Sequence, residues 1–392
     1  MAAVLLAAVP VAAQTADDLF DPKSIQEIRL SVNSRDLGTL RAHTELNTWY
    51  TADLTWRNIR VRNAGIRSRG QGSRNPTKPG YRVDFAHYTT GQTFVGLSTI
   101  ILDNIWQDDS QLRERLAFTM FDRMGQPVPR ESFCRLYVNN AYQGLYAITE
   151  EIDGNFAKRV TGETDGTVFE YHWSVDGKWW AEDLGSIAAY KPKLEPRTHV
   201  LDADSTLYNP IVSLFKEVNG PDDAVGRSRV EEYIDLKQFM IHAGIEEFIA
   251  ENDGILGYAG MNNFYLYRGQ GTAKHRLFVW DQDYAFDTID INTPPRATDA
   301  NVIFRRAMAD PELREAYFQA IEDCARIAAA DGFLLDEIER LVGIIVDTVR
   351  SDPNKQFDND RWDQAVEYLR QFAVRRPQVM LDEVARLRKG GH

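Results

Sequence analysis

The stretch that decides how this chain is interpreted is FVWDQDYAFD, residues 278–287. The apolar run Leu277–Trp280 predicts a strand that ends in two acids, Asp281 and Asp283. Side chains at alternate positions of an extended segment point to the same side. Two carboxylates between aromatic residues are costly to desolvate unless a cation holds them, and Mg²⁺ prefers oxygen ligands. The alternative is an Asp-rich turn in which Asp281 caps its own backbone, and this stretch alone leaves both interpretations open.

The upstream segment favours the metal site. A predicted helix ends at Asp253 and runs into the glycine-rich loop Gly254–Gly260. A segment with strand-like alternation follows, and it begins with Asn262 and Asn263. Together with Asp281, this produces the order Asp, Asn, Asp that protein kinases use for a catalytic acid and two metal ligands. The kinase HRD and DFG motifs are absent.

Composition limits the class of protein. The chain has 392 residues, of which 43% are apolar, so it can bury a sizeable core and form two lobes. A net charge of −13 argues against non-specific nucleic-acid binding, which needs a basic surface. The two cysteines, Cys134 and Cys324, fit neither a disulfide framework nor a zinc cluster, and one bridge or none remains open.

The first segment, Met1–Ala13, is apolar and built of small residues. It is too short to span a bilayer. It is similar to the apolar region of a signal peptide, with Val11 and Ala13 at the −3 and −1 positions of a cleavage site. We therefore predict export to the periplasm, the cell surface or the medium, the alternative being an apolar N-terminal extension. No other run is long and apolar enough to predict a transmembrane anchor.

Periodicity predicts an α+β protein with two unequal lobes, β-rich first and helical last. We place the β-rich lobe at residues 20–165 and the helical lobe at residues 166–392. Strands are predicted at residues 28–32, 54–61, 133–138, 145–149 and 167–171. Helices are predicted at residues 36–42, 108–124, 153–160, 208–218, 236–251, 312–330, 334–350 and 361–389, the last with a possible interruption at Pro377, and residues 173–199 are predicted to be an irregular insertion.

A basic, glycine-rich segment covers Ile66–Arg82. Glycine lets backbone amides approach a ligand closely, and cations neutralise phosphate oxygens. The segment is not a Walker A loop, and the alternative is a solvated basic hairpin. The cations in and just before it are Arg62, Arg67, Arg69, Arg74, Lys78 and Arg82.

Glu150 follows a predicted β-hairpin. Two roles are open for it: an ion pair with the basic segment, or a place at the start of the next helix, where the helix dipole favours an acid. Motifs of several other enzyme classes are absent, since the chain contains no GxSxG, HExxH or CxxC.

Several stretches together resemble the CotH family of spore-coat protein H-type kinases. They are GIRSRGQGSR, KPGYRVDF, RLYVNNAYQGLYAITEEID, NNFYLYR and FVWDQDYAFD, and they run in the family's order from about Phe20 to Asp287. The resemblance implies a single, atypical protein kinase-like domain. It also implies ATP- and Mg²⁺-dependent phosphorylation of Ser or Thr in a protein or peptide substrate, by an exported or spore-surface protein.

The resemblance also implies roles for individual residues. Asp253 corresponds to the acid at the end of the family's helix, Asn263 to the Asn that opens the following strand, and Asp281 to the first acid of WDxD. Asp253 would orient the acceptor hydroxyl and, with Asn263, Asp281 and Asp283, hold Mg²⁺. Glu150 corresponds to the Glu after the hairpin.

The cation that contacts ATP is less defined. The basic residue of the family's RxKG-like segment falls on Arg69, where Lys is common, and Lys78 and Arg82 are competing candidates. Two other functions also remain open: transfer of AMP or ligation on the same fold, and a non-catalytic coat or surface protein. The retention of Asp253, Asn263 and Asp281 argues against the last.

Overall fold

The computed structural model describes residues 14–174, 177–221, 223–291 and 298–390. Within these ranges the chain folds into two compact units. The first unit contains the chain up to Asn104 together with Glu131–Thr149. The second contains Ile105–Arg130 and the chain from Glu150 onward.

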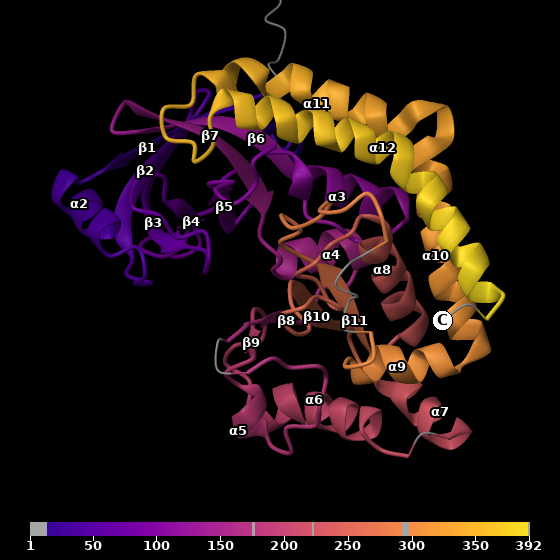
Figure 1. Cartoon of the computed structure of the whole chain (residues 1–392). Helices are drawn as coiled ribbons and strands as arrows, with labels where there is room; N and C mark the ends of the chain where they lie inside the picture. Colours follow the sequence, from indigo (N-terminus) through magenta and orange to yellow (C-terminus); the bar gives the residue numbers. More distant parts are fainter. Residues whose placement is uncertain (1–13, 175–176, 222, 292–297, 391–392) are drawn as a thin grey trace, which may run out of the picture. The chain divides into compact units, whose positions relative to one another are not determined.

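The first unit is built on a closed barrel, hydrogen-bonded in the order β1, β2, β3, β4, β5, β7, β6 (Figure 1). Strands β1 and β6 run parallel where they close the barrel. Closure leaves the sheet without exposed edges. The strands are β1 (Gln26–Val32), β2 (Tyr50–Trp56), β3 (Ile59–Arg69), β4 (Gly80–Asp84), β5 (Thr99–Asp103), β6 (Glu131–Val138) and β7 (Ala141–Glu150).

The core of the barrel comes from the alternation seen in the sequence. In β1 the buried positions are Ile28, Leu30 and Val32, as predicted for a strand with one apolar face. Trp56 is fully buried, and its indole Nε1 donates to Gln26 Oε1 at 2.9 Å. Two helices, α1 (Ala16–Leu19) and α2 (Ser34–Ala42), belong to this unit.

The predicted single strand at residues 54–61 is wrong, because the chain reverses direction there. Arg57 has a left-handed φ of 51°, and Trp56 pairs with Ile59 across the turn between β2 and β3. Arg57 and Asn58 are both exposed, so the alternation of buried and exposed positions is interrupted at this turn.

The second unit contains a four-stranded sheet in the order β11, β10, β8, β9. Its neighbouring strands pair antiparallel. The strand predicted at residues 167–171 is confirmed as β8. The strands are β8 (Thr167–Tyr171), β9 (Leu194–Pro196), β10 (Phe264–Arg268) and β11 (His275–Val279).

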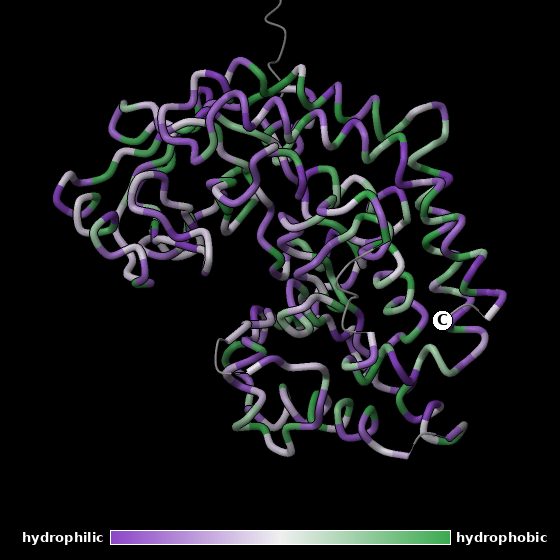
Figure 2. The backbone as a smooth tube through the Cα atoms, in the orientation of Figure 1, coloured by the Kyte–Doolittle hydropathy of each residue, from purple (hydrophilic) through white to green (hydrophobic). Residues whose placement is uncertain are grey.

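Helices make up most of the second unit. Helix α10 packs against α8 and α12, and α11 runs beside α12 (Figure 1). Hydrophilic and hydrophobic residues alternate along these helices (Figure 2), as expected where one face is buried. The elements are α3 (Arg113–Arg123), α4 (Gly154–Thr161), α5 (Ile187–Tyr190), α6 (Asp204–Val218), α7 (Ala224–Tyr233), α8 (Leu236–Phe248), α9 (Val302–Ala309), α10 (Pro311–Ala329), the 3₁₀ turn η1 (Ala330–Gly332), α11 (Phe333–Arg350) and α12 (Asn359–Arg388).

Several helix predictions need correction. Helix α12 continues through Pro377 without interruption. Helix α3 begins at Arg113 rather than at residue 108, because Asp108 accepts the Arg113 amide (2.8 Å) from outside the helix. The region 173–199 is not wholly irregular, since it contains α5 and β9, and the prediction missed α7 and α9.

The α+β class is confirmed, while closure of the first sheet into a barrel was not predicted. The predicted division at residue 165 differs from the two compact units, because helices α3 and α4 both belong to the second. The predicted export segment Met1–Ala13 lies outside the described residues. Within the part of the chain that the structure describes, no helix has the length and apolar character needed to cross a membrane.

Candidate functional site

The glycine-rich loop after α8 rests on a buried carboxylate. Glu246 of α8 is fully buried, and its Oε2 accepts the Ile255 amide at 2.9 Å. His242, one turn earlier, lies 3.1 Å from Glu246 Oε1 through Nε2. A Cβ added to Gly254 would come within 2.4 Å of the Glu246 carboxylate, so only glycine fits there. Glu246 therefore anchors the loop that contains Gly254 to helix α8, and Asp253 lies between this helix and the loop.

Asp253 is held by two amide side chains. Asn262 Nδ2 donates to Asp253 Oδ2 at 2.9 Å. Asn263 Nδ2 donates to Asp253 Oδ2 at 3.3 Å and to the Asp253 carbonyl at 3.1 Å. Because both amides donate through nitrogen, their oxygen atoms point away from Asp253. The predicted grouping of Asp253 with the Asn pair is present in the structure.

Asn263 also connects this group to the strand that leads to Asp281. Its backbone carbonyl accepts the Trp280 amide at 3.2 Å. Trp280 directly precedes Asp281, so this backbone bond brings Asp281 to the Asn pair, and the charge of Asp281 is one cause of the raised pKa of Asp253. Asp253, Asn262, Asn263 and Asp281 therefore form one cluster, which we call the acid–amide cluster.

The pKa of Asp253 reflects this environment. Burial raises it, the negative charge of Asp281 raises it further, and hydrogen bonds from Asn262 and Asn263 lower it. The balance raises the pKa of Asp253 to about 6. Such a carboxyl group exchanges protons close to neutral pH, which suits a residue that accepts a proton.

Four residues near the cluster have left-handed backbones. They are Ala250, Asn263, Asp281 and Phe286, with φ of 54°, 56°, 49° and 60°. For Ala and Phe this conformation costs roughly 1–2 kcal/mol each. The Phe286 amide donates to the carbonyl of Ile249, the residue before Ala250, at 2.5 Å. One hydrogen bond therefore joins the backbone at two of the strained residues. Backbone strain of this kind is typical of functional sites.

The local conformation of the acid stretch differs from the prediction. The left-handed Asp281 ends the extended segment, Gln282 is fully buried, and Asp283 opens a turn. Alternation along a strand therefore does not bring Asp281 and Asp283 to one side. The pKa values of the Tyr258 and Tyr284 hydroxyls are raised mainly by burial. The charge of Asp283 is among the further causes that raise both.

Glu150 is bound in a way that neither prediction described. Its side chain is 3% exposed and contacts two guanidinium groups, Arg130 at 2.7 Å and Arg159 at 2.6 Å. The next helix, α4, is capped by Asp153 instead, which accepts the Asn155 and Phe156 amides. Glu150 is thus the centre of a buried ion-pair group.

In the first unit, the side chains of Arg69 and Arg74 form contacts that hold the loop between β3 and β4 in place. Arg74 donates to the carbonyls of Gly70 (2.6 Å) and Thr44 (2.5 Å) and to Asn47 Oδ1 (2.6 Å). Arg69 at the end of β3 forms an ion pair with Asp103. This basic segment is therefore not a freely solvated hairpin.

Lys78 is buried within the first unit. It is 1% exposed, and its Nζ lies 5.2 Å above the Tyr146 ring. The Tyr146 hydroxyl donates to the Pro79 carbonyl at 3.0 Å, which fixes the ring. Arg82 is half-buried and pairs in register with Arg67 across β3 and β4. Arg69, Lys78 and Arg82 thus belong to one unit and the acid–amide cluster to the other.

A second group of potential metal ligands is an ion-pair network. The ligand atoms of Glu170, His172 and Glu195 lie within 4.8 Å of one another. However, His172 Nε2 already contacts Glu195 Oε2 at 2.7 Å. Arg197 lies 3.5 Å from the Glu170 carboxylate and 3.7 Å from that of Glu195. The guanidinium offsets the charges that a metal would otherwise balance.

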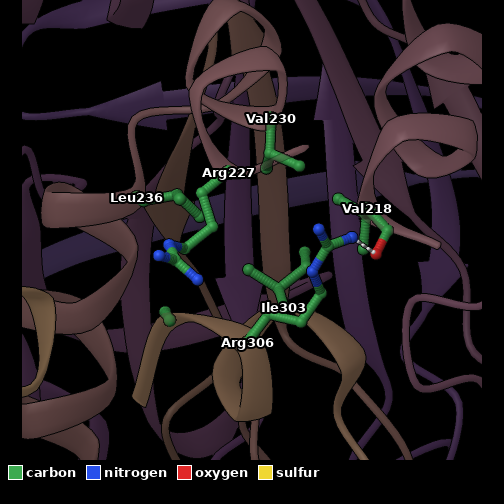
Figure 3. Close-up of a pocket in the computed structure, with 7 residues that line it drawn as sticks. Val218, Arg227, Val230, Leu236, Ile303 and Arg306 are labelled. Carbon is green, nitrogen blue, oxygen red and sulfur yellow. Dashed lines mark hydrogen bonds between the residues drawn. The ribbon is translucent and has the colours of Figure 1, made fainter. Parts of the chain in front are cut away.

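A cavity of about 360 Å³ lies in the first unit, beside Gln26, Arg29 and Thr55. Two others lie on the second unit. A groove of about 650 Å³ is lined by Gln126, Glu163, Gln238, Tyr267 and Arg276, among others, and by none of the acid–amide residues. A small pocket between Val218, Ile303 and Arg306 has about 10 Å³, room for no more than a water (Figure 3).

The two cysteines are buried free thiols. Burial raises the pKa of both Cys134 and Cys324, which makes them poor nucleophiles.

The sequence interpretation missed the residues that support the cluster. His242 and Glu246 were detectable as an acid and a histidine one helical turn apart, just before a glycine-rich loop. Arg113 donates to the Ala285 carbonyl at 2.8 Å and holds the acid turn from α3. Arg376 of α12 is fully buried and contacts the segments on both sides of the cluster. No local pattern signals such long-range contacts.

The chain is similar to several known proteins. The chain is 25% identical over 330 residues to the inner spore coat protein H of Bacillus subtilis (strain 168), covering 82% of this chain and 87% of that protein. A structural similarity to the Helicobacter pylori proinflammatory kinase CtkA covers 86% of this chain and 92% of that one, at 10% identity and a TM-score of 0.29. The family model described as CotH kinase protein matches residues 66–380, which include the acid–amide cluster. The chain therefore belongs to the CotH kinase protein family.

Proposed function

We propose that this chain is an exported, Mg²⁺-dependent kinase that transfers the γ-phosphoryl group of ATP to Ser or Thr of a protein or peptide. The observation that carries the proposal is the acid–amide cluster, in which a helix end, a loop and a strand end bring two acids and two amides together. Membership of the CotH kinase protein family supports it.

The cluster is chemically suited to Mg²⁺. The negative charge of Asp281 raises the proton affinity of Asp253, and a divalent cation between them would relieve that repulsion. The amide oxygen of Asn263 points away from Asp253 and would complete an all-oxygen set. Asp281, Asn263 and Asp253 would hold the ion, and Asp283 would act from the adjoining turn. When bound, Mg²⁺ would neutralise the oxygens of the ATP phosphates.

Arg69, Lys78 and Arg82 are the proposed contacts for the ATP phosphates. Arg67 and Arg82 pair in register across β3 and β4, so two cations lie on neighbouring strands. Lys78 is a buried cation of the same unit. Glu150 would act indirectly, by fixing Arg130 and Arg159 beside the end of β7.

Asp253 would align the acceptor hydroxyl and accept its proton. The acceptor oxygen forms a bond to the γ-phosphorus while the bond to the β–γ bridging oxygen breaks, so ADP leaves with that electron pair. Burial and the charge of Asp281 raise the pKa of Asp253 in the metal-free protein, and bound Mg²⁺ would lower it again. The protein contributes mainly position and electrostatic stabilisation.

The name of the Bacillus relative, an inner spore coat protein, supports a location on an outer layer of the cell or spore. Together with the apolar segment Met1–Ala13, it favours an exported protein.

The test is incubation of the purified chain with ATP, Mg²⁺ and candidate acceptor proteins, followed by intact-mass analysis. A phosphoryl increment on the acceptor, lost when the metal is chelated, supports the proposal. An adenylyl increment would indicate AMP transfer on the same fold. The absence of any product and of nucleotide binding would leave a structural coat protein.

A further inference from the structure

One buried guanidinium joins the two segments that carry the catalytic acids. Arg376 of α12 is fully buried. It donates to the carbonyls of Glu247 (2.6 Å) and Phe248 (3.0 Å), in the last turn of α8. It also donates to the carbonyls of Ile289 (3.3 Å) and Asp290 (2.5 Å), beyond the acid stretch. The first pair precedes Asp253 in the chain, and the second pair follows Asp281.

Phe372, one turn before Arg376 on the same helix, makes the matching apolar contacts. Its ring packs edge-on against Phe248 at 6.4 Å and against Phe286 at 5.0 Å. The Arg376 guanidinium lies 5.7 Å from the Phe372 ring. The two side chains of α12 therefore contact the same two segments, one through hydrogen bonds and one through rings.

The joined segments also contact each other directly. Asn252 Nδ2 donates to Asp287 Oδ2 at 2.6 Å, and the Phe286 amide donates to the Ile249 carbonyl. The Tyr368 hydroxyl of α12 donates to the Asp287 carbonyl at 2.9 Å. The spacing of these two segments is thus fixed by hydrogen bonds between them and by hydrogen bonds from α12.

We propose that Arg376 is a positioning residue that fixes the separation of Asp253 and Asp281 and thereby the affinity for the divalent cation. The inference rests on the proposed function, because it assigns a metal to these acids. A planar guanidinium can serve four carbonyls that diverge in direction, which neither lysine nor an apolar side chain can do. Mutation of a residue that orients metal ligands without binding the metal itself typically changes the metal affinity by about 10–100-fold.

A structural arginine elsewhere in the unit provides a matched control. Arg306 of α9 is 7% exposed and donates to the Val218 carbonyl at the end of α6 (Figure 3). It also donates to the carbonyls of Glu217 (2.9 Å), in the last turn of α6, and Pro221 (2.5 Å), just beyond it. Arg306 therefore caps a helix end as Arg376 does, but it caps α6 rather than α8. A second, exposed control is Arg375, which neighbours Arg376 on α12 and lies 3.7 Å from the Asp290 carboxylate.

The experiment compares Arg376→Met with Arg306→Met and Arg375→Met in the full chain. Binding of Mn²⁺ without nucleotide is measured by electron paramagnetic resonance of the free ion. We expect Arg376→Met to bind Mn²⁺ at least about tenfold more weakly than the parent. We expect Arg306→Met, although destabilised, and Arg375→Met to bind it as the parent does. Equal affinity of Arg376→Met and Arg306→Met would overturn the inference.

Amide hydrogen exchange of the metal-free proteins separates this inference from the proposed function. Arg376→Met should exchange faster than Arg306→Met in both segments, residues 247–255 and 281–290. If the parent binds no Mn²⁺, the proposed metal site fails, while faster exchange in both segments still supports Arg376 as the residue that joins them. Unchanged exchange there would overturn the positioning role even if the parent binds the metal.

Discussion

Asp281 lies close enough to Asp253 for its negative charge to add to the effect of burial, and together they raise the pKa of Asp253 to about 6. The two residues are distant in sequence and come from a loop after α8 and from the end of β11. Such a pair is unfavourable in the protein alone and favourable around a cation. The affinity for a cation therefore depends on how firmly the fold holds these two residues.

The first prediction concerns the packing of the glycine-rich loop against Glu246. Gly254→Ala places a Cβ within 2.4 Å of the buried Glu246 carboxylate, so either the loop or this carboxylate, with its hydrogen bond to the Ile255 amide, must shift. We expect a loss of about 1–3 kcal/mol in the free energy of unfolding, together with weaker Mn²⁺ binding. Urea denaturation and metal titration measure the two effects.

Gly343 of α11 provides the control, because a Cβ there meets nothing within 4 Å. Gly343→Ala should stabilise the protein by about 0.5–1 kcal/mol through higher helix propensity. If Gly254→Ala behaved like Gly343→Ala, the proposed contact with Glu246 would be incorrect.

The second prediction concerns Lys78. Because it is 1% exposed, Lys78→Ala should lower the free energy of unfolding by about 2 kcal/mol or more, as other large-to-small changes in a core do. The exposed Lys23→Ala, in the same unit, should leave it almost unchanged. Nucleotide binding, followed by fluorescence of an ATP analogue, should also weaken in Lys78→Ala but not in Lys23→Ala. Wild-type nucleotide affinity in Lys78→Ala would remove Lys78 from the proposed ATP contacts.

Part of the site was predictable, because each of its residues lies in a short sequence pattern of its own. A helix followed by glycines, a strand with paired asparagines and a strand ending in acids predicted Asp253, Asn263 and Asp281 as a group, and the structure brings them together. The prediction that Asp281 and Asp283 share one side failed, since a left-handed Asp281 interrupts the strand and no periodicity shows a single change of φ.

The remaining features depend on contacts between distant parts of the chain. Closure of the barrel requires β1 to pair in parallel with β6, for example Gln26 with Cys134, and neither strand's own pattern specifies its partner. The burial of Lys78 and of Arg376 is likewise invisible locally, because charged residues are usually exposed.

The third prediction concerns acid stability. His275 of β11 is fully buried, and burial lowers its pKa to about 4, while its Nδ1 contacts the Tyr233 carbonyl at 2.8 Å. Below the ordinary pKa of about 6.5, the unfolded chain takes up a proton that the folded chain does not. The free energy of unfolding should therefore fall as pH drops from about 6.5 to about 4, by up to about 3 kcal/mol from this residue.

Urea denaturation across this pH range measures the effect. His275→Asn retains a donor for the Tyr233 carbonyl without the titrating ring, so its stability should fall less steeply than that of the parent. His43, 54% exposed, serves as the control, and His43→Asn should keep the parent's slope. Parallel slopes for the parent and His275→Asn would show that His275 does not supply this dependence.

The measurement that most directly tests the central claim is Mg²⁺-dependent turnover of ATP by Asp281→Asn, beside its free energy of unfolding without metal. The substitution keeps the shape of the side chain and removes one negative charge next to Asp253. We predict that turnover falls by roughly two orders of magnitude or more, while the metal-free protein is as stable as the parent or slightly more so, because repulsion is relieved. Normal turnover with a clear loss of stability would instead show that Asp281 only caps a turn, and the proposed catalytic site would be wrong.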